Sequence, residues 1–177
     1  MQFTKHIFIT GFMGSGKSTI SKRLSKQLKL DLIDLDKFIQ ESEEMTIDDI
    51  FKTNGEQYFR ELESNYLNKI ISIKKPHLIA LGGGTVCFND NLTPIKKNGI
   101  LIYIELSAKT LFQRLENAKN ERPLLKNLSG NDLMTFIEEK LEERKSFYQQ
   151  AHISINGLKV SPQTIAYELI DFQKKDN

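Results

Sequence analysis

The segment IFITGFMGSGKS, residues 7–18, begins with a short apolar, β-branched run and ends with a match to the pattern G-x-x-x-x-G-K-[ST]. Ile20, Leu24 and Leu28 follow at helical spacing. The sequence therefore predicts a strand over 7–10, a glycine-rich loop, and a helix over 18–30. A loop of this pattern between a strand and a helix N-terminus is typical of phosphate binding.

Each residue type in this loop suits an anionic ligand. The glycines let successive backbone N–H groups point at phosphate oxygens, Lys17 adds a point charge, and the Ser18 hydroxyl can bind Mg²⁺. A dinucleotide fingerprint is excluded, because reading on from Gly14 and Gly16 places Thr19 where a third glycine is needed. We therefore expect a nucleoside triphosphate with Mg²⁺, bound by Gly11, Gly14, Ser15, Gly16, Lys17, Ser18 and Thr19.

Apolar runs and helical periodicities alternate along the rest of the chain. Further strands are expected over 32–33, 77–81, 100–104 and 152–155, and further helices over 36–44, 46–54, 56–73, 89–97, 131–150 and from 107 and 161 onward. The central strands are apolar on both faces. This pattern favours an α/β fold, with a parallel sheet covered by helices on both sides.

The composition bounds the functional classes. With 177 residues, one domain over 1–177 is expected. The 25 Lys and Arg nearly balance the 23 Asp and Glu, so no strong overall field favours nucleic acid or an acidic membrane surface as a partner. Cys87 is the single cysteine, so the chain has no intramolecular disulfide. No apolar run approaches the length of a membrane-spanning helix, about 20 residues. We therefore expect a cytoplasmic protein that acts on a small molecule.

Three uses of the nucleotide leave different marks on a sequence. A switch GTPase needs Asn-Lys-x-Asp after a strand, but Asn68-Lys69 lies in a helical pattern. A Walker-type ATPase needs an acidic residue at the end of an apolar strand, whereas the run 77–81 continues into Gly82. A kinase for a small molecule remains, and its metal-side carboxylate must come from another strand.

Asp34 and Asp36 follow the apolar pair 32–33 at a predicted strand end. Ligands of open parallel sheets bind beyond the carboxyl ends of the strands, and residues two apart can face one cleft. One carboxylate can organise the Mg²⁺ shell while the other accepts a hydrogen bond from an attacking hydroxyl. The alternative is that Asp36 only caps the next helix.

Two arginines lie beside apolar helix faces. Arg144 falls on an apolar stripe, so its guanidinium needs either an internal carboxylate or an anionic ligand. Arg60 has a comparable place, although Glu56 and Glu63 offer a surface-pair explanation. Two such arginines near Asp36 suit a small hydroxylated carboxylic acid, because planar forks bind a carboxylate and a carboxylate binds hydroxyls.

Two loops complete the candidate site. Gly82, Gly83 and Gly84 directly follow an apolar strand, where residues without a Cβ allow a ligand ring to approach the backbone. Arg122 lies in the segment 119–130, which has little periodicity. We expect this segment to close as a lid that brings a cation to the phosphates and expels water, with a solvated arginine as the alternative.

Together these residues resemble the shikimate kinases, in order along nearly the whole chain. The matching motifs are Gly11 to Ser18, Asp34-Leu35-Asp36, Asn54-Gly55-Glu56 with Phe59-Arg60 and Glu63, Leu81 to Gly84, Arg122 to Leu125, and Glu143-Arg144 with Tyr148. The resemblance implies a P-loop kinase fold with strand order 2-3-1-4-5. It also implies ATP-dependent phosphorylation of the 3-hydroxyl of shikimate, in aromatic amino-acid biosynthesis.

The same resemblance implies residue roles. Lys17, Asp36 and Arg122 would be catalytic, Ser18 and Asp34 would serve Mg²⁺, Arg114 would stack near adenine, and Asp36, Arg60, Gly82, Gly83, Gly84 and Arg144 would hold shikimate. Residues 36–63 would form a substrate-binding subdomain, and the protein is expected to be a monomer. The alternatives are another small P-loop kinase, of the gluconate or nucleoside monophosphate type, and a non-catalytic ATP-binding module.

Overall fold

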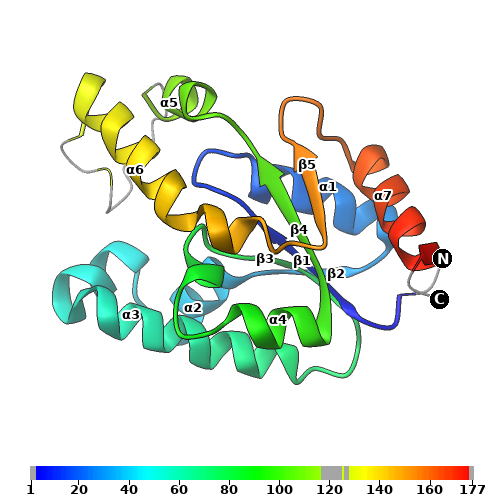
Figure 1. Ribbon diagram of the computed structural model, residues 1–177. Coiled ribbons are helices and arrows are strands. Elements are labelled where there is room, and N and C mark those ends of the chain that lie inside the picture. The colour runs from blue at the N-terminus through cyan, green and yellow to red at the C-terminus, as the bar shows by residue number, and fades with distance from the viewer. Residues whose placement is uncertain (1–2, 117–124, 126–127, 176–177) are drawn as a thin grey trace.

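Five parallel strands form one sheet in the order β2-β3-β1-β4-β5 (Figure 1). The computed structural model describes residues 3–116, 125 and 128–175. The strands are β1 (His6–Thr10), β2 (Asp31–Asp34), β3 (His77–Ala80), β4 (Gly99–Glu105) and β5 (Ile153–Asn156). The expected α/β class and strand order are confirmed. Because all strands are parallel, their carboxyl ends meet at one edge, where ligands bind in such sheets.

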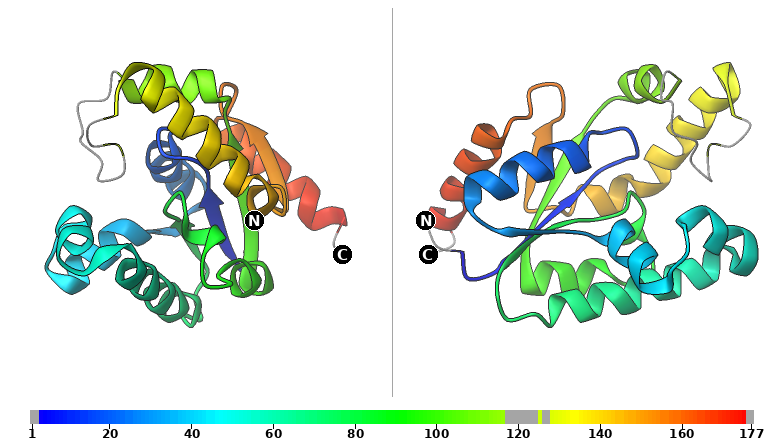
Figure 2. Two further views of the ribbon diagram at one scale, coloured as in Figure 1. Left: turned by 60° about the vertical axis from the view of Figure 1, so that its left-hand side comes forward. Right: turned by 180° about the vertical axis from the view of Figure 1, so that it is seen from behind.

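Helices cover both faces of the sheet (Figure 2). One face carries α1 (Lys17–Leu28) and α7 (Pro162–Lys175), and the other carries α3 (Ile47–Ile71) and α4 (Leu92–Asn98). The remaining helices are α2 (Leu35–Glu43), which follows β2 directly, the short 3₁₀ helix η1 (Thr85–Cys87), and α5 (Ala108–Glu116), which packs on α6 (Gly130–Tyr148). In the described part of the chain, no helix has both the length and the apolar character of a membrane span.

The side chains of β1 alternate between the two helical layers. Ile7 and Ile9 pack in the core below α1 and α7, whereas Phe8 packs in the core with α3 and α4. All three are fully buried, which agrees with strands that are apolar on both faces. This central strand therefore holds its carboxyl end, Thr10, in a fixed place.

Two local differences from the expected elements have simple backbone causes. The two helices expected on either side of Gly55 form one helix, α3, which is kinked because Gly55 has non-helical φ/ψ of 84° and 173°. Thr46, where the sequence predicts that a helix begins, caps α3 by accepting a hydrogen bond from the Asp49 N–H. Helix α4 begins at Leu92 rather than at residue 89, since Asn89 and Asp90 have positive φ.

Candidate active site

The phosphate-binding loop lies between β1 and α1. Gly16 is the N-cap of α1 in a left-handed conformation, with φ 92°, which favours glycine over any residue with a Cβ. Lys17 begins the helix, and its Nζ donates to the carbonyl oxygens of Gly11 at 2.6 Å and Phe12 at 3.1 Å. Ser18 and Thr19 are exposed in the first helical turn. The loop thus has the strand and helix context that its sequence predicts.

Arg114 reaches this loop from α5. Its Nη1 donates to the carbonyl oxygens of Gly14 at 3.2 Å and Ser15 at 3.3 Å. The guanidinium is exposed, and it lies 3.7 Å from the position that a Cβ on Gly16 would take. Arg114 therefore lies at the outer side of the phosphate loop.

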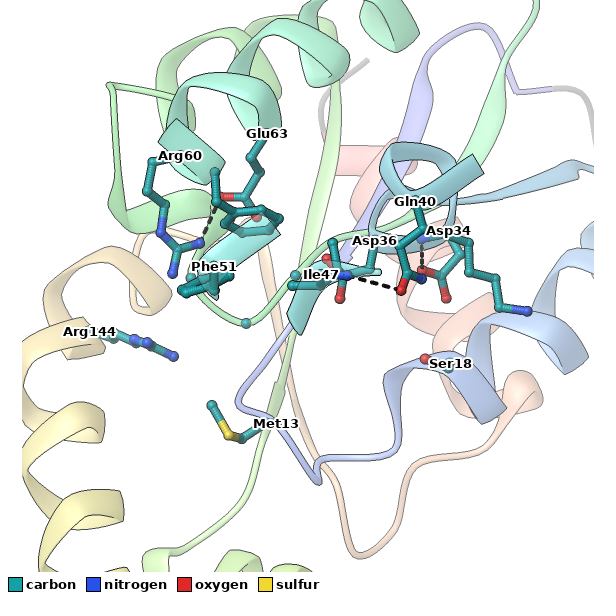
Figure 3. A pocket seen from close by; sticks show the side chains of 15 residues that line it. Met13, Ser18, Asp34, Asp36, Gln40, Ile47, Phe51, Arg60, Glu63 and Arg144 are labelled. Carbon is teal, nitrogen blue, oxygen red and sulfur yellow. Dashed lines mark hydrogen bonds and ion pairs between the residues drawn. The ribbon is translucent and has the colours of Figure 1, made fainter. Parts of the chain in front are cut away.

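A cavity of about 470 Å³ opens beside the phosphate loop, at the carboxyl ends of β2 and β3 (Figure 3). It brings together the strand end at Asp34, the glycine segment after β3, and side chains from α2, α3 and α6. The lining residues are Met13, Ser18, Asp34, Asp36, Lys37, Gln40, Ile47, Phe51, Phe59, Arg60, Glu63, Gly82, Gly83, Gly84 and Arg144. The cavity therefore holds every residue that the sequence analysis assigned to shikimate.

Asp34 and Asp36 both line this cavity, but they differ in local role. Asp34 is the N-cap of α2, and its carboxylate accepts a hydrogen bond from the Lys37 N–H at 3.4 Å. Asp36 lies inside the first turn of α2. The alternative that Asp36 caps this helix is therefore wrong, because Asp34 occupies the cap.

Gly82 is the point at which three polar side chains converge. A Cβ on Gly82 would lie 2.9 Å from Glu63 Oε1, 3.0 Å from Asp36 Oδ1 and 3.0 Å from Thr85 Oγ1. These distances are shorter than normal van der Waals contacts, so any larger residue would displace the carboxylates. The glycine after β3 therefore keeps Asp36 and Glu63 close together on α2 and α3.

Arg60 is held on several sides by α3 and its neighbours. Its Nη1 donates to Glu63 at 2.9 Å, while Nε and Nη2 donate to Glu56 at 3.2 and 2.9 Å. The guanidinium also stacks 4.2 Å from the centre of the Phe88 ring. The pairing with Glu56 and Glu63 was expected from the sequence, but a surface location was wrong, because the Arg60 side chain is only 7% exposed.

Glu63 is the main site residue that sequence reasoning did not select. Its side chain is 1% exposed and accepts hydrogen bonds from Arg60 and, at 2.6 Å, from the Thr85 hydroxyl. Burial raises the pKa of the Glu63 carboxyl, and the charge of Arg60 opposes that shift. Its spacing of three residues from Arg60 was a visible signal, but its hydrogen bond with Thr85 joins residues 22 positions apart in the sequence.

Arg144 differs from Arg60 because it lacks a counter-charge. It lies in α6, is 5% exposed, and its buried Nη1 has no hydrogen-bond partner. Among the residues that the structure describes, no carboxylate forms an ion pair with it. The guanidinium stacks over the Phe12 ring at 5.4 Å and points into the cavity (Figure 3). A buried, unpaired guanidinium is unfavourable, so this arrangement is suited to an anionic ligand.

At Gly83 and Gly84 the backbone lies close to the guanidinium groups of Arg144 and Arg60. A Cβ on Gly84 would lie 3.0 Å from Arg60 Nη2, and a Cβ on Gly83 would lie 3.6 Å from Arg144 Nη1. The two cations therefore approach the glycine segment from α3 and α6. A ligand carboxylate between them would lie against backbone rather than side chains.

Ser18 and Asp34 both line the cavity and offer oxygen ligands, the type that Mg²⁺ prefers. No group of three or more His, Cys, Asp or Glu within the described ranges could hold a metal alone. In kinases, Mg²⁺ usually binds through nucleotide phosphates and water, with one or two protein ligands. Arg122 and most of the expected lid, 119–130, lie outside the described residues.

Comparisons with known proteins agree over nearly the whole chain. The profile of the family described as "Shikimate kinase" matches residues 13–174. A shikimate kinase from Parabacteroides distasonis is 38% identical over 165 residues, which cover 93% of this chain and 95% of the relative. The structure of a shikimate kinase from Bacteroides thetaiotaomicron superposes with a TM-score of 0.86 at 34% identity, covering 96% of this chain and 98% of that one.

A second solved structure, a shikimate kinase from Acinetobacter baumannii in complex with shikimate, has a TM-score of 0.85 at 28% identity. The match covers 99% of this chain and 96% of that one. Sequence and fold therefore agree over nearly the full length of both proteins. The chain belongs to the shikimate kinase family.

Proposed function

We propose that this protein is a shikimate kinase, which transfers the γ-phosphoryl group of ATP to the 3-hydroxyl of shikimate and yields shikimate 3-phosphate and ADP. Family membership supports the reaction, and the cavity supports the substrate. The observation that carries the proposal is Arg144 Nη1, which is buried without a hydrogen-bond partner in a cavity that also contains Asp36. A cyclic acid with hydroxyl groups would supply an acceptor for Arg144 Nη1 and hydroxyl groups within reach of Asp36.

The carboxylate of shikimate would bind at Arg144 and Arg60. Arg144 provides an open donor, whereas Arg60 is already held by Glu56 and Glu63 and contributes a fixed positive charge. The ring would then rest against the backbone of Gly82, Gly83 and Gly84. This placement directs the hydroxyl groups toward α2, where Asp36 lies.

At the other end of the cavity, the phosphate loop would hold ATP. Its backbone N–H groups and Lys17 would neutralise the phosphates, with Ser15 in the loop and Thr19 in the first turn of α1 as further contacts. Ser18 and Asp34 would hold Mg²⁺, which supplies charge neutralisation at the transferred group when bound. Arg114 would stack near adenine, and Arg122 would approach the phosphates from the lid.

In the reaction, the 3-hydroxyl oxygen would form a bond to the γ-phosphorus while the bond to the bridging oxygen of ADP breaks. Asp36 would accept the hydroxyl proton. Because the transition state of phosphoryl transfer is loose, positioning and charge neutralisation contribute more than a strong base. A lid over 119–130 would exclude water and so suppress hydrolysis of ATP. The residues 36–63 would form the part of the molecule that receives shikimate.

We also propose that the protein is a monomer and that it lies in the cytoplasm, where ATP is available as co-substrate.

The activity is tested by ADP release in a coupled assay with Mg²⁺-ATP and one acceptor at a time. We expect saturable ADP release with shikimate and background rates with gluconate and nucleoside monophosphates. ADP release with gluconate or a monophosphate alone would identify another kinase. ATP binding without release by any acceptor would indicate a non-catalytic module.

A further inference from the structure

Tyr148 lies at the end of α6, one helical turn beyond Arg144. Residues four apart share one helix face, so both side chains point from α6 toward the sheet. The Tyr148 ring is 1% exposed and stacks on Tyr103 of β4, with 4.6 Å between ring centres and an interplanar angle of 16°. The stack fixes the plane of the ring, and with it the position of the hydroxyl.

That hydroxyl donates a hydrogen bond to the carbonyl oxygen of Gly83, at 2.5 Å. Burial raises the pKa of the Tyr148 phenol, while the charge of Arg144 acts in the opposite direction. The phenol therefore keeps its proton at neutral pH and remains a donor. This bond joins α6 to a glycine that lies 65 residues earlier in the sequence.

Gly83 lies between the phosphate loop and the Arg144 side chain. A Cβ on Gly83 would lie 3.3 Å from the Gly11 carbonyl oxygen, 3.4 Å from the Met13 nitrogen and 3.6 Å from Arg144 Nη1. Little room is left for this segment to shift without moving one of those neighbours. A constraint on Gly83 is therefore a constraint on the spacing between the loop and the guanidinium.

Besides a side-chain interaction with the Tyr148 hydroxyl, the Arg144 guanidinium has few restraints. In the portion of the chain described, no carboxylate pairs with it, and its Nη1 has no hydrogen-bond partner. It contacts the face of the Phe12 ring, and such a contact does not fix the guanidinium in one position on the ring. The position of its backbone on α6 therefore decides where the charge lies.

We propose that Tyr148 is a positioning residue, which ties α6 to the Gly83 carbonyl and thereby sets the distance between the Arg144 guanidinium and the phosphate loop. The inference rests on the proposed function, in which Arg144 binds the substrate carboxylate and the loop binds ATP. Tyr148 acts through Arg144 and Gly83 and does not touch the reacting atoms.

The test is Tyr148→Phe, which keeps the stacked ring and removes only the hydroxyl. We expect the KM for shikimate to rise about fivefold, as for the loss of one hydrogen bond of about 1 kcal/mol, while kcat and the KM for ATP change less than about twofold. An unchanged KM for shikimate, or an equal loss in kcat and in both KM values, would overturn the proposal. The matched control is Tyr103→Phe, because the Tyr103 hydroxyl bonds to no described residue.

A substrate analogue separates positioning of Arg144 from a general loosening of the fold. The carboxamide of shikimate keeps the ring and hydroxyl groups but removes the negative charge that Arg144 would bind. In the unaltered enzyme the acid should bind more tightly than the amide, and in Tyr148→Phe this preference should shrink about fivefold, with the KM for the amide nearly unchanged. An equal loss for acid and amide would contradict a role through Arg144.

A measurement without substrate keeps this inference distinct from the proposed function. In the ligand-free protein, the Arg144 Nε–H signal in NMR, assigned with Arg144→Lys, should be sharp and should shift toward solvent-exposed values in Tyr148→Phe, while the Arg60 signal stays in place. If the unaltered protein releases no ADP with shikimate, the proposed function is wrong, and this signal alone decides the role of Tyr148. An Arg144 signal that does not respond would overturn the positioning role even in an active enzyme.

Discussion

The substitution Arg144→Met should separate function from stability, because the two respond to this guanidinium in opposite directions. Methionine replaces the apolar stem of arginine but has no donor and no charge. The Arg144 side chain is buried, and its Nη1 has no hydrogen-bond partner. A buried unsatisfied donor costs about 1–3 kcal/mol, while the stacking of the guanidinium on Phe12 returns about 0.5–1 kcal/mol. The free energy of unfolding without ligand should therefore rise by about 1 kcal/mol.

Substrate binding should change the other way. Hydrogen bonds between charged groups contribute about 1.5–3 kcal/mol each, so the KM for shikimate should rise by about 10-fold to 150-fold. The KM for ATP should change little, because Arg144 does not contact the phosphate loop through a hydrogen bond. Urea unfolding of the ligand-free protein measures the first effect, and shikimate-dependent ADP release measures the second.

Lys145→Met is the matched control, one residue further along α6. Lys145 is exposed and pairs at the surface with Glu142 at 3.2 Å, an interaction that contributes little. Its unfolding free energy should change by no more than about 0.5 kcal/mol, and its KM for shikimate by no more than about twofold. The reasoning would be refuted if Arg144→Met lost more than about 1 kcal/mol of stability and kept the unaltered KM, since Arg144 would then be a structural residue.

Three further predictions concern separate parts of the molecule. Lys17→Ala should lower kcat about 100-fold or more with a nearly unaltered KM for shikimate, because phosphate charge is neutralised mainly at the transition state. A matching loss of thermal stability in the variant would argue against this explanation. Burial raises the pKa of the Cys87 thiol from 9.0 to about 11, so at pH 8 a disulfide reagent should label it ~100-fold more slowly than in urea. Burial also lowers the pKa of His6 from 6.5, and His6 Nδ1 accepts a hydrogen bond from the His77 N–H. The unfolded chain then takes up this proton first, so stability should fall as pH drops below about 6.5, by at most ~1.4 kcal/mol per pH unit, and His6→Asn should flatten that slope in urea titrations.

The elements of the fold were predictable from the sequence where the signals are local. The strand and helix around the phosphate loop, the cap at Thr46 and the break at Gly55 all follow from neighbouring residues. The start of α4 was placed three residues too early, because nothing in its composition announces the positive φ of Asn89 and Asp90. Strand order came from the family resemblance and not from the periodicity of the residues.

The residues expected to bind shikimate all line the cavity, whereas Glu63 and the contacts inside the site were not predicted. The sequence predicts that Arg144 needs an anion, since a charged residue interrupts an apolar stripe. It does not predict the hydrogen bond from the Thr85 hydroxyl to the buried Glu63, or the bond from Tyr148 to the Gly83 carbonyl. These contacts join residues 22 and 65 positions apart, so they exist only after the sheet and its helices have come together.

A crystal structure with shikimate, ADP and Mg²⁺ tests the assignment of the two ends of the cavity most directly. The account predicts a shikimate carboxylate oxygen within about 3.2 Å of Arg144 Nη1, the ring against Gly82 to Gly84, the 3-hydroxyl facing Asp36, and the ADP phosphates in the loop that ends at Lys17. A shikimate molecule bound with its carboxylate away from both Arg60 and Arg144, or with its 3-hydroxyl turned away from the phosphates, would contradict it.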